Sequence, residues 1–218
     1  MEIRNQRAIH GPGWTEVILG IGLSLLAGVA LGFVWLVFKP VVVAKELSET
    51  APPGSVFYYP GATGSSASRA WMRKRQILVE GQSGSFQLTE EELNAWAADA
   101  FKPPSDESSA LIVPGKINFR VADGTLQIAA PTTVNFLGVA LPVIIQARGV
   151  FERSAGTFIY QPHELFLGSL ATHRVPGLAP RVLHYIAESH PLPQDVLDGW
   201  RKLSAASIEG RQLQLTLP

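Results

Sequence analysis

The feature that most constrains this chain is an uncharged apolar run from Val17 to Phe38. A helix rises about 1.5 Å per residue, so a run of this length matches the roughly 30 Å hydrocarbon core of a bilayer. Trp14 and Trp35 lie near its two ends, where indole rings favour the headgroup region, and Lys39 follows it directly. The run is longer than the roughly 7–15 apolar residues of a cleaved signal sequence and too uniformly apolar for a core helix. We therefore predict one transmembrane helix over 17–38, after a short tail over 1–16.

Small residues recur every four positions along this helix, at Gly20, Ser24, Gly28 and Gly32. This spacing aligns them on one stripe, where the backbone of a second helix can approach closely. Small residues are also frequent in membrane helices as a matter of composition. The stripe indicates either a helix–helix contact, by self-association or with another membrane protein, or composition alone.

Charges beside the span do not decide its orientation, because Arg4 and Arg7 before it balance Lys39 and Lys45 after it. A short N-terminal tail followed by a large C-terminal domain is typical of an anchor whose C-terminal side is translocated. We expect a single-pass protein of the bacterial inner (cytoplasmic) membrane, with the C-terminal domain on the extracytoplasmic side.

Composition and motifs argue against several functions. Lys and Arg number 18, as do Asp and Glu, so the chain lacks the basic excess of a nucleic-acid binder, and no nucleic-acid partner is expected. The chain has no cysteine, which excludes disulfides and thiolate metal sites. Nucleotide-binding, serine-hydrolase and zinc-protease motifs are absent, and His163 and His173 lack the spacing of a helical metal pair. We predict no enzymatic activity, no cofactor and no metal site.

The segment after the span changes character twice. Residues 39–68 are rich in proline and glycine and predict a linker or irregular arm, although the apolar stretch 56–59 should pack on the domain or at the membrane surface. The segment 69–79 is compatible with a helix or a twisted strand.

Thr89 lies three residues before Glu92, which predicts a capping box at the start of a helix with an apolar stripe ending at Phe101. Capping explains the acidic residues of its first turn without chemistry.

From residue 110 the apolar period becomes two, which predicts an antiparallel meander of long strands. Two short helices are expected over 180–189 and 194–203. A terminal strand ending at Leu217 should close one edge of the sheet. The fold class is therefore α+β: a curved antiparallel sheet packed on one main helix, plus short C-terminal helices, forming one domain over 69–218.

An apolar face along this sheet is the candidate ligand site. On the longest strand, alternate residues place apolar side chains on one face and Gln146 and Arg148 on the other. The hairpin before this strand has an apolar tip, where tips are normally polar. The candidate residues for an apolar ligand are Trp96, Phe136, Leu141, Val143, Ile145 and Phe151.

The phrase Thr89-Glu90-Glu91-Glu92-Leu93-Asn94, followed by long strands, a helix and a terminal strand, resembles small membrane-anchored bacterial proteins of the TULIP-like lipid-binding group, of the YceB, LmeA and YpmS type. The resemblance covers roughly 84–218. It implies a curved sheet wrapped on a helix with an apolar groove for acyl chains. The proline-rich breaks and two C-terminal helices of this chain depart from that pattern.

Two functions follow as hypotheses. The first is a membrane-anchored, non-enzymatic domain that binds a lipid or another apolar ligand near the bilayer. The alternative is a structural or accessory subunit that docks on a membrane protein complex through its transmembrane helix.

Overall fold

The computed structural model describes residues 13–44, 55–64, 66–101, 111–136 and 138–218. The N-terminal tail up to residue 12, the 45–54 part of the expected arm and the side chain of Phe136 lie outside the described residues.

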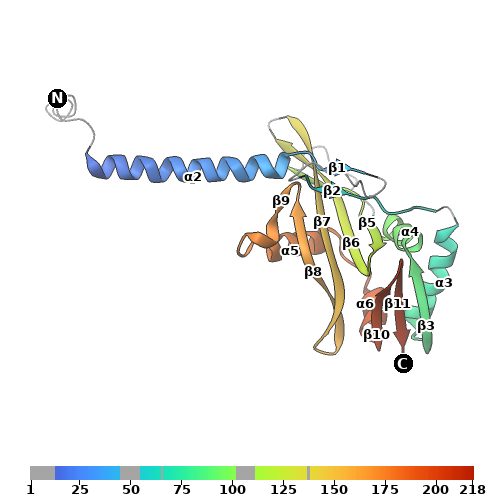
Figure 1. Cartoon of the computed structure of the whole chain (residues 1–218). Coiled ribbons are helices and arrows are strands. Elements are labelled where there is room, and N and C mark those ends of the chain that lie inside the picture. The colour runs from blue at the N-terminus through green and yellow to red at the C-terminus, as the bar shows by residue number, and fades with distance from the viewer. Residues whose placement is uncertain (1–12, 45–54, 65, 102–110, 137) are drawn as a thin grey trace.

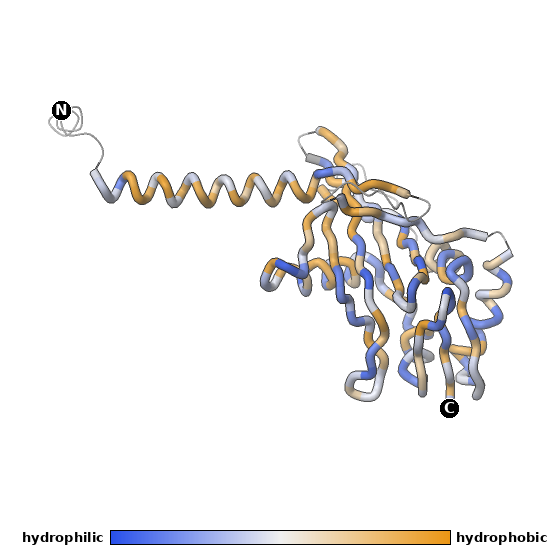
Figure 2. The backbone as a smooth tube through the Cα atoms, viewed as in Figure 1, coloured by the Kyte–Doolittle hydropathy of each residue, from blue (hydrophilic) through white to orange (hydrophobic). Residues whose placement is uncertain are grey.

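The apolar run forms α2 (Trp14–Phe38), which extends away from the rest of the chain (Figure 1). It starts three residues before the apolar run, after Gly13 in an extended conformation. The helix is long and apolar enough to cross a membrane, and none of its residues is buried. Figure 2 shows apolar residues along almost its whole length. Because its apolar side chains are exposed, α2 is not a core helix.

The larger sheet is antiparallel and is built around three long strands, β6, β7 and β8, as the period-two pattern predicts. Its strands are β4 (Ile112–Pro114), β5 (Asn118–Ala122), β6 (Thr125–Phe136), β7 (Val139–Ser154), β8 (Thr157–Leu167) and β9 (Leu170–Ala171). β4 and β5 both pair with β6, and between them the Gly115 amide donates to the Pro131 carbonyl. The β7–β8 pairing contains a bulge between Arg148 and Gly149.

The terminal strand occupies a different place from the one expected. A second sheet has the order β10 (Ala205–Glu209), β11 (Gln212–Leu217) and β3 (Gly84–Thr89), so the terminal strand β11 is central rather than an edge of the long meander. Its three leucines are buried. A strand with such a buried face gains from a neighbour on each side, and β10 and β3 supply both.

Two cores hold the domain together. The larger lies between the second sheet, the β5–β6 hairpin and three helices: α3 (Ala67–Glu80), α4 (Glu90–Ala100) and α6 (Gln194–Arg201). The smaller lies where α5 (Leu178–Ser189) covers β7 and β8, after the short 3-10 turn η1 (Thr172–Arg174). The open choice at 69–79 is resolved as a helix, because Trp71 and Leu78 face the larger core.

The proline- and glycine-rich segment after α2 is not a free linker where it is described. Its β1 (Val42–Val43) and β2 (Phe57–Tyr58) form a short parallel pair, and Tyr58 and Tyr59 are buried on the domain. The apolar stretch 56–59 therefore packs on the domain, one of the two expected outcomes. Taken together, the elements confirm the α+β fold class.

Candidate functional site

Trp96, a candidate ligand residue, is enclosed by the chain's own aromatic rings. Its ring centroid lies 5.5 Å from that of Trp71, 5.7 Å from Phe119 and 5.4 Å from Phe101. Edge and stacked contacts at these distances are typical of a packed aromatic core. The structure therefore packs the partly buried Trp96 against the larger core, between α3, α4 and β5.

Of the other candidate residues with described side chains, Phe151 and Ile145 pack with the two cores, and Val143 and Leu141 belong to neither. Phe151 lies 5.1 Å from the Trp200 ring of α6 and 5.8 Å from the Tyr160 ring, while Ile145 lies under α5 in the smaller core. Val143 is buried and Leu141 is half-buried nearer the hairpin tip. The candidate face thus contacts α5 and α6 rather than forming one continuous groove along the described strand.

The acidic start of α4 is structural. The Thr89 hydroxyl accepts from the Glu92 amide, and the Glu92 carboxylate accepts from the Thr89 amide, which confirms the capping box. Glu92 also pairs with Lys74 at 2.6 Å, and Glu90 accepts from the amides of Val121 and Ala62. Within the described ranges, no group of three or more metal-binding side chains is present.

Amide side chains on the face of the sheet opposite the larger core hold the arm in place, a role that the sequence pattern does not predict. Gln146 donates to the Phe57 carbonyl at 3.1 Å and Gln127 to the Tyr59 carbonyl at 3.2 Å. Asn118 accepts from the Gly61 amide at 2.7 Å. Gln146 was expected on a polar outer face, but it is only 2 % exposed because the arm covers it. Local sequence gave little signal, since Asn118 and Gln146 each lie two positions before an arginine, Arg120 and Arg148, as on an exposed polar face.

The end of α2 is joined directly to the domain at the β8–β9 turn. The Ser169 amide donates to the Leu36 carbonyl at 3.0 Å, and the Ser169 hydroxyl donates to the Lys39 carbonyl at 3.2 Å. Gly168 has a φ of +59°, and a Cβ there would collide with the Val37 carbonyl. The last turn of α2 and this turn therefore pack backbone against backbone, a contact that needs glycine.

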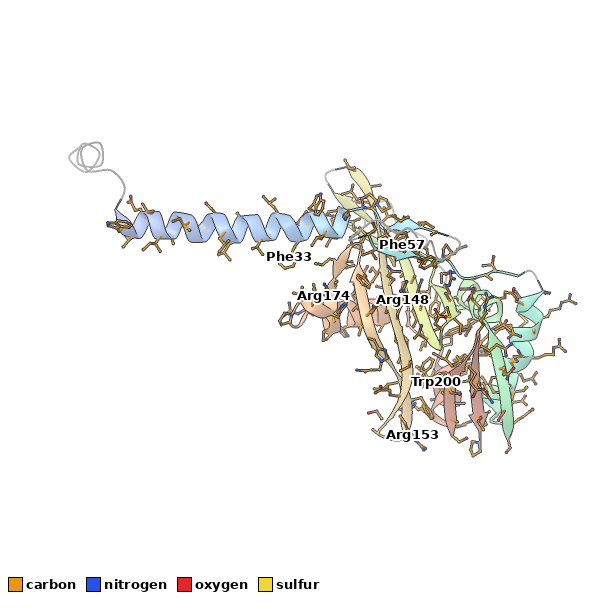
Figure 3. The ribbon with its side chains drawn as sticks, viewed as in Figure 1. Phe33, Phe57, Arg148, Arg153, Arg174 and Trp200 are labelled. Atoms are coloured by element: carbon orange, nitrogen blue, oxygen red, sulfur yellow. The ribbon has the colours of Figure 1, made fainter. Side chains whose placement is uncertain are left out.

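Two exposed groups lie on either side of this junction. The β6–β7 hairpin tip presents Val139 and Ala140 to solvent, and Val139 is 55 % exposed. On the other side, the η1–α5 segment extends back along the direction of α2 in Figure 1. It carries the exposed side chains of Arg174 and Arg181, and Figure 3 shows Arg174 on the α2 side of the domain. The domain face nearest α2 therefore combines an apolar tip with the basic side chain of Arg174.

The small residues of α2, namely Gly20, Ser24, Gly28 and Gly32, are exposed. A Cβ added at any of the three glycines would meet no atom within 4 Å, so the stripe is open along the helix.

These features define an α+β domain carried directly on a single exposed apolar helix. No family model matches the chain, and no curated protein matches it. Among solved structures, a crystal structure of a lipopolysaccharide binding protein aligns with 80 % of this chain at 13 % identity and a TM-score of 0.17. The chain spans about half of that protein, 48 %. A TM-score this low does not establish a shared fold, so the resemblance to the TULIP-like group stays a prediction.

Proposed function

We propose that this protein is a non-enzymatic module, anchored in a membrane by α2, that binds lipid at the bilayer surface. The observation that carries the proposal is the junction at Ser169. Its hydrogen bonds to the carbonyls of Leu36 and Lys39 attach the end of the apolar helix directly to the domain. With α2 across a bilayer, the β8–β9 turn lies at the depth of the last apolar turn, and the face around it meets the headgroups.

The chemistry of that face suits lipid. Exposed Val139 at the hairpin tip favours the boundary between headgroups and acyl chains. Arg174 attracts anionic headgroups and contributes about 1 kcal/mol near a charged surface. Lys39 lies over the Trp35 ring at 5.4 Å, a pairing typical of an interfacial helix end. These groups support binding at the surface.

The packing of the apolar strand face favours surface binding over enclosure of an acyl chain. Trp96 and Phe151, which would line a groove, contact Trp71 and Trp200 instead. A lipid inside the fold would have to displace these rings, whereas a lipid at the α2 face displaces only water.

Site-directed labelling tests the proposal, because the chain has no native cysteine. Ala140→Cys at the hairpin tip, Arg174→Cys in η1 and Ser68→Cys on α3 replace exposed residues of the full-length protein. Each variant receives an environment-sensitive fluorophore and is placed in liposomes with a quencher on the lipid headgroups. We expect several-fold stronger quenching at positions 140 and 174 than at 68, which lies on the helix far from α2 (Figure 1). Equal quenching at all three positions would contradict the proposal.

The same variants report orientation. A membrane-impermeant maleimide added to intact cells should label Ser68→Cys from outside the inner membrane, if the domain is extracytoplasmic as the sequence predicts. Labelling only after the membrane is opened would place the domain in the cytoplasm.

A second function, as an accessory subunit that docks through α2, is favoured by the open space around Gly28 and Gly32. A Gly28→Leu/Gly32→Leu variant should lose a co-purifying or self-associated partner while the domain stays folded. Gly22→Leu is the matched control, since it also adds a side chain in open space but lies off the stripe. Equal association of all three proteins would exclude a contact through the stripe.

A further inference from the structure

A row of polar side chains crosses the larger sheet on the face away from the larger core. Arg120 pairs in register with Gln127, Gln127 with Arg148, and Arg148 with Glu164. Arg120 on β5 and Arg148 on β7 are separated by the single strand β6, and neighbouring strands lie about 4.8 Å apart. Directly opposed residues share a face of the sheet, so both guanidinium groups project to the same side.

The arm brings an aromatic ring over this row. Both arginines lie over the Tyr59 ring, with the Arg120 Cζ 4.9 Å and the Arg148 Cζ 5.9 Å from its centroid. Gln127 fixes the position of the arm by donating to the Tyr59 carbonyl, and its side-chain oxygen accepts from the Arg148 Nε at 3.2 Å. A guanidinium that stacks on a ring face can still donate from its N–H edge, although on Arg148 part of this edge is already bonded to Gln127. The two cations are therefore oriented in advance.

A cavity of about 80 Å³ opens between these groups. On the same measure, roughly 10–15 Å³ is enough to hold one water molecule, so the space admits a polyatomic group. Ala122 and Thr125 of the β5–β6 turn line its edge, and their small side chains leave it open. Asp123 also lines the cavity, and Glu164, which is not part of its lining, lies 3.7 Å from Arg148.

We propose that this cavity binds a single phosphate group, free or as a phosphate monoester, between Arg120 and Arg148. Within the described part of the chain, no carboxylate forms an ion pair with Arg120, so its donors are available. Arginine presents parallel N–H groups that match two oxygens of a phosphate, and a tetrahedral dianion can accept from two such groups at once. The site is distinct from the α2 face of the proposed function.

Calorimetric titration of inorganic phosphate into the full-length protein, in an uncharged phosphate-free detergent, tests the site. We expect saturable binding that Arg120→Gln weakens at least tenfold. Arg120→Lys keeps the charge but loses the paired donors, and should give an intermediate affinity. Arg153→Gln is the matched control: Arg153 also lies over a ring, at 5.8 Å from the Phe158 centroid, but at the far end of β7 (Figure 3), and its loss should leave the affinity unchanged.

A purely structural role for the arginines gives a different result. If they only clamp the arm, Arg120→Gln lowers the unfolding temperature, but phosphate neither binds nor raises the unfolding temperature of the wild type. That outcome would overturn the proposal, as would equal phosphate affinity in the wild type and Arg120→Gln. Should Arg120→Gln fail to fold, the comparison of Arg120→Lys with Arg153→Gln decides in the same way.

The same titration, with the protein in lipid nanodiscs, distinguishes a lipid headgroup from a soluble phosphate compound. If phosphatidic acid in the disc competes with inorganic phosphate, and phosphatidylcholine does not, the site takes a lipid headgroup. If neither lipid changes the affinity, the ligand is a soluble phosphate compound.

Discussion

At the scale of single residues, Asn94 links three parts of the chain. Its side-chain oxygen accepts from the Phe119 amide at 2.7 Å, and its nitrogen donates to the carbonyls of Phe119 at 2.8 Å and Ala62 at 2.9 Å. Asn118 donates to the same oxygen at 3.1 Å. The amide thus bonds to β5 as a neighbouring strand would, and joins α4 to both β5 and the arm.

We expect Asn94→Ala to destabilise the protein by about 3 kcal/mol, because it leaves buried backbone groups of Phe119 unpaired and each such group costs roughly 1–3 kcal/mol. Urea unfolding of the full-length protein in detergent, followed by tryptophan fluorescence, measures the change. Asp99→Ala, at an exposed position of the same helix, should shift stability by less than about 0.5 kcal/mol. A similar shift for the two variants would contradict the role assigned to Asn94.

Residues of this kind mark the limit of prediction from sequence. The Thr89–Glu92 capping box was predictable because both partners lie within one helical turn. The partners of Asn94 lie 24, 25 and 32 positions away, and nothing local distinguishes it from an exposed asparagine. The Arg120–Arg148 pair was missed for the same reason, since the register that aligns the strands, and the arm that adds Tyr59, are tertiary features.

At the scale of elements, the contact between α2 and the β8–β9 turn depends on Gly168. Gly210, in the β10–β11 turn, has the same φ of +59° but open space around it. An alanine at Gly210 would therefore incur only the strain of a left-handed backbone, whereas an alanine at Gly168 would incur that strain and a steric collision.

We expect Gly210→Ala to cost about 1–2 kcal/mol from backbone strain alone. Gly168→Ala adds the collision with Val37 and should also detach the end of α2, so that the Ser169 amide exchanges with solvent much faster. Hydrogen exchange measured by mass spectrometry over 165–172 reads this directly. Unchanged protection in Gly168→Ala would show that the junction tolerates a side chain.

Most elements followed from periodicity, since long alternating strands and an amphipathic helix carry their pattern in the sequence. Periodicity does not predict which strand a short strand pairs with. The terminal strand β11 carries an alternating pattern that any sheet edge could accept, and its position between β10 and β3 is set by packing on α3 and α4. The arm was hidden by its prolines and glycines, which indicate irregular backbone whether it is free or bound.

At the scale of the whole molecule, two tyrosines make the free energy of unfolding depend on pH in the alkaline range. Tyr160 lies against the larger core and donates to the Leu126 carbonyl at 2.8 Å. Burial raises the pKa of Tyr160 above its ordinary value, although nearby Arg148 acts in the opposite direction, and burial also raises the pKa of Tyr58. Above about pH 10 the unfolded chain loses these protons while the folded chain keeps them.

We therefore expect these tyrosines to lower the free energy of unfolding above about pH 10, by up to about 1.4 kcal/mol per pH unit for each of them. Tyr160→Phe should cost about 1 kcal/mol at pH 8 through the lost hydrogen bond, but should lose stability less steeply above pH 10. Urea unfolding between pH 8 and 11 compares the slopes. Parallel curves for the variant and the wild type would exclude Tyr160 as a source of the dependence.

The backbone contact at Gly168 also has a mechanical consequence. A helix longer than the local bilayer is thick accommodates the difference by tilting. Because the end of α2 is fixed to the domain, such a tilt rotates the whole domain as a rigid body, and the opening of the Arg120–Arg148 cavity rotates with it. The thickness of the surrounding bilayer would then set the direction in which that opening points.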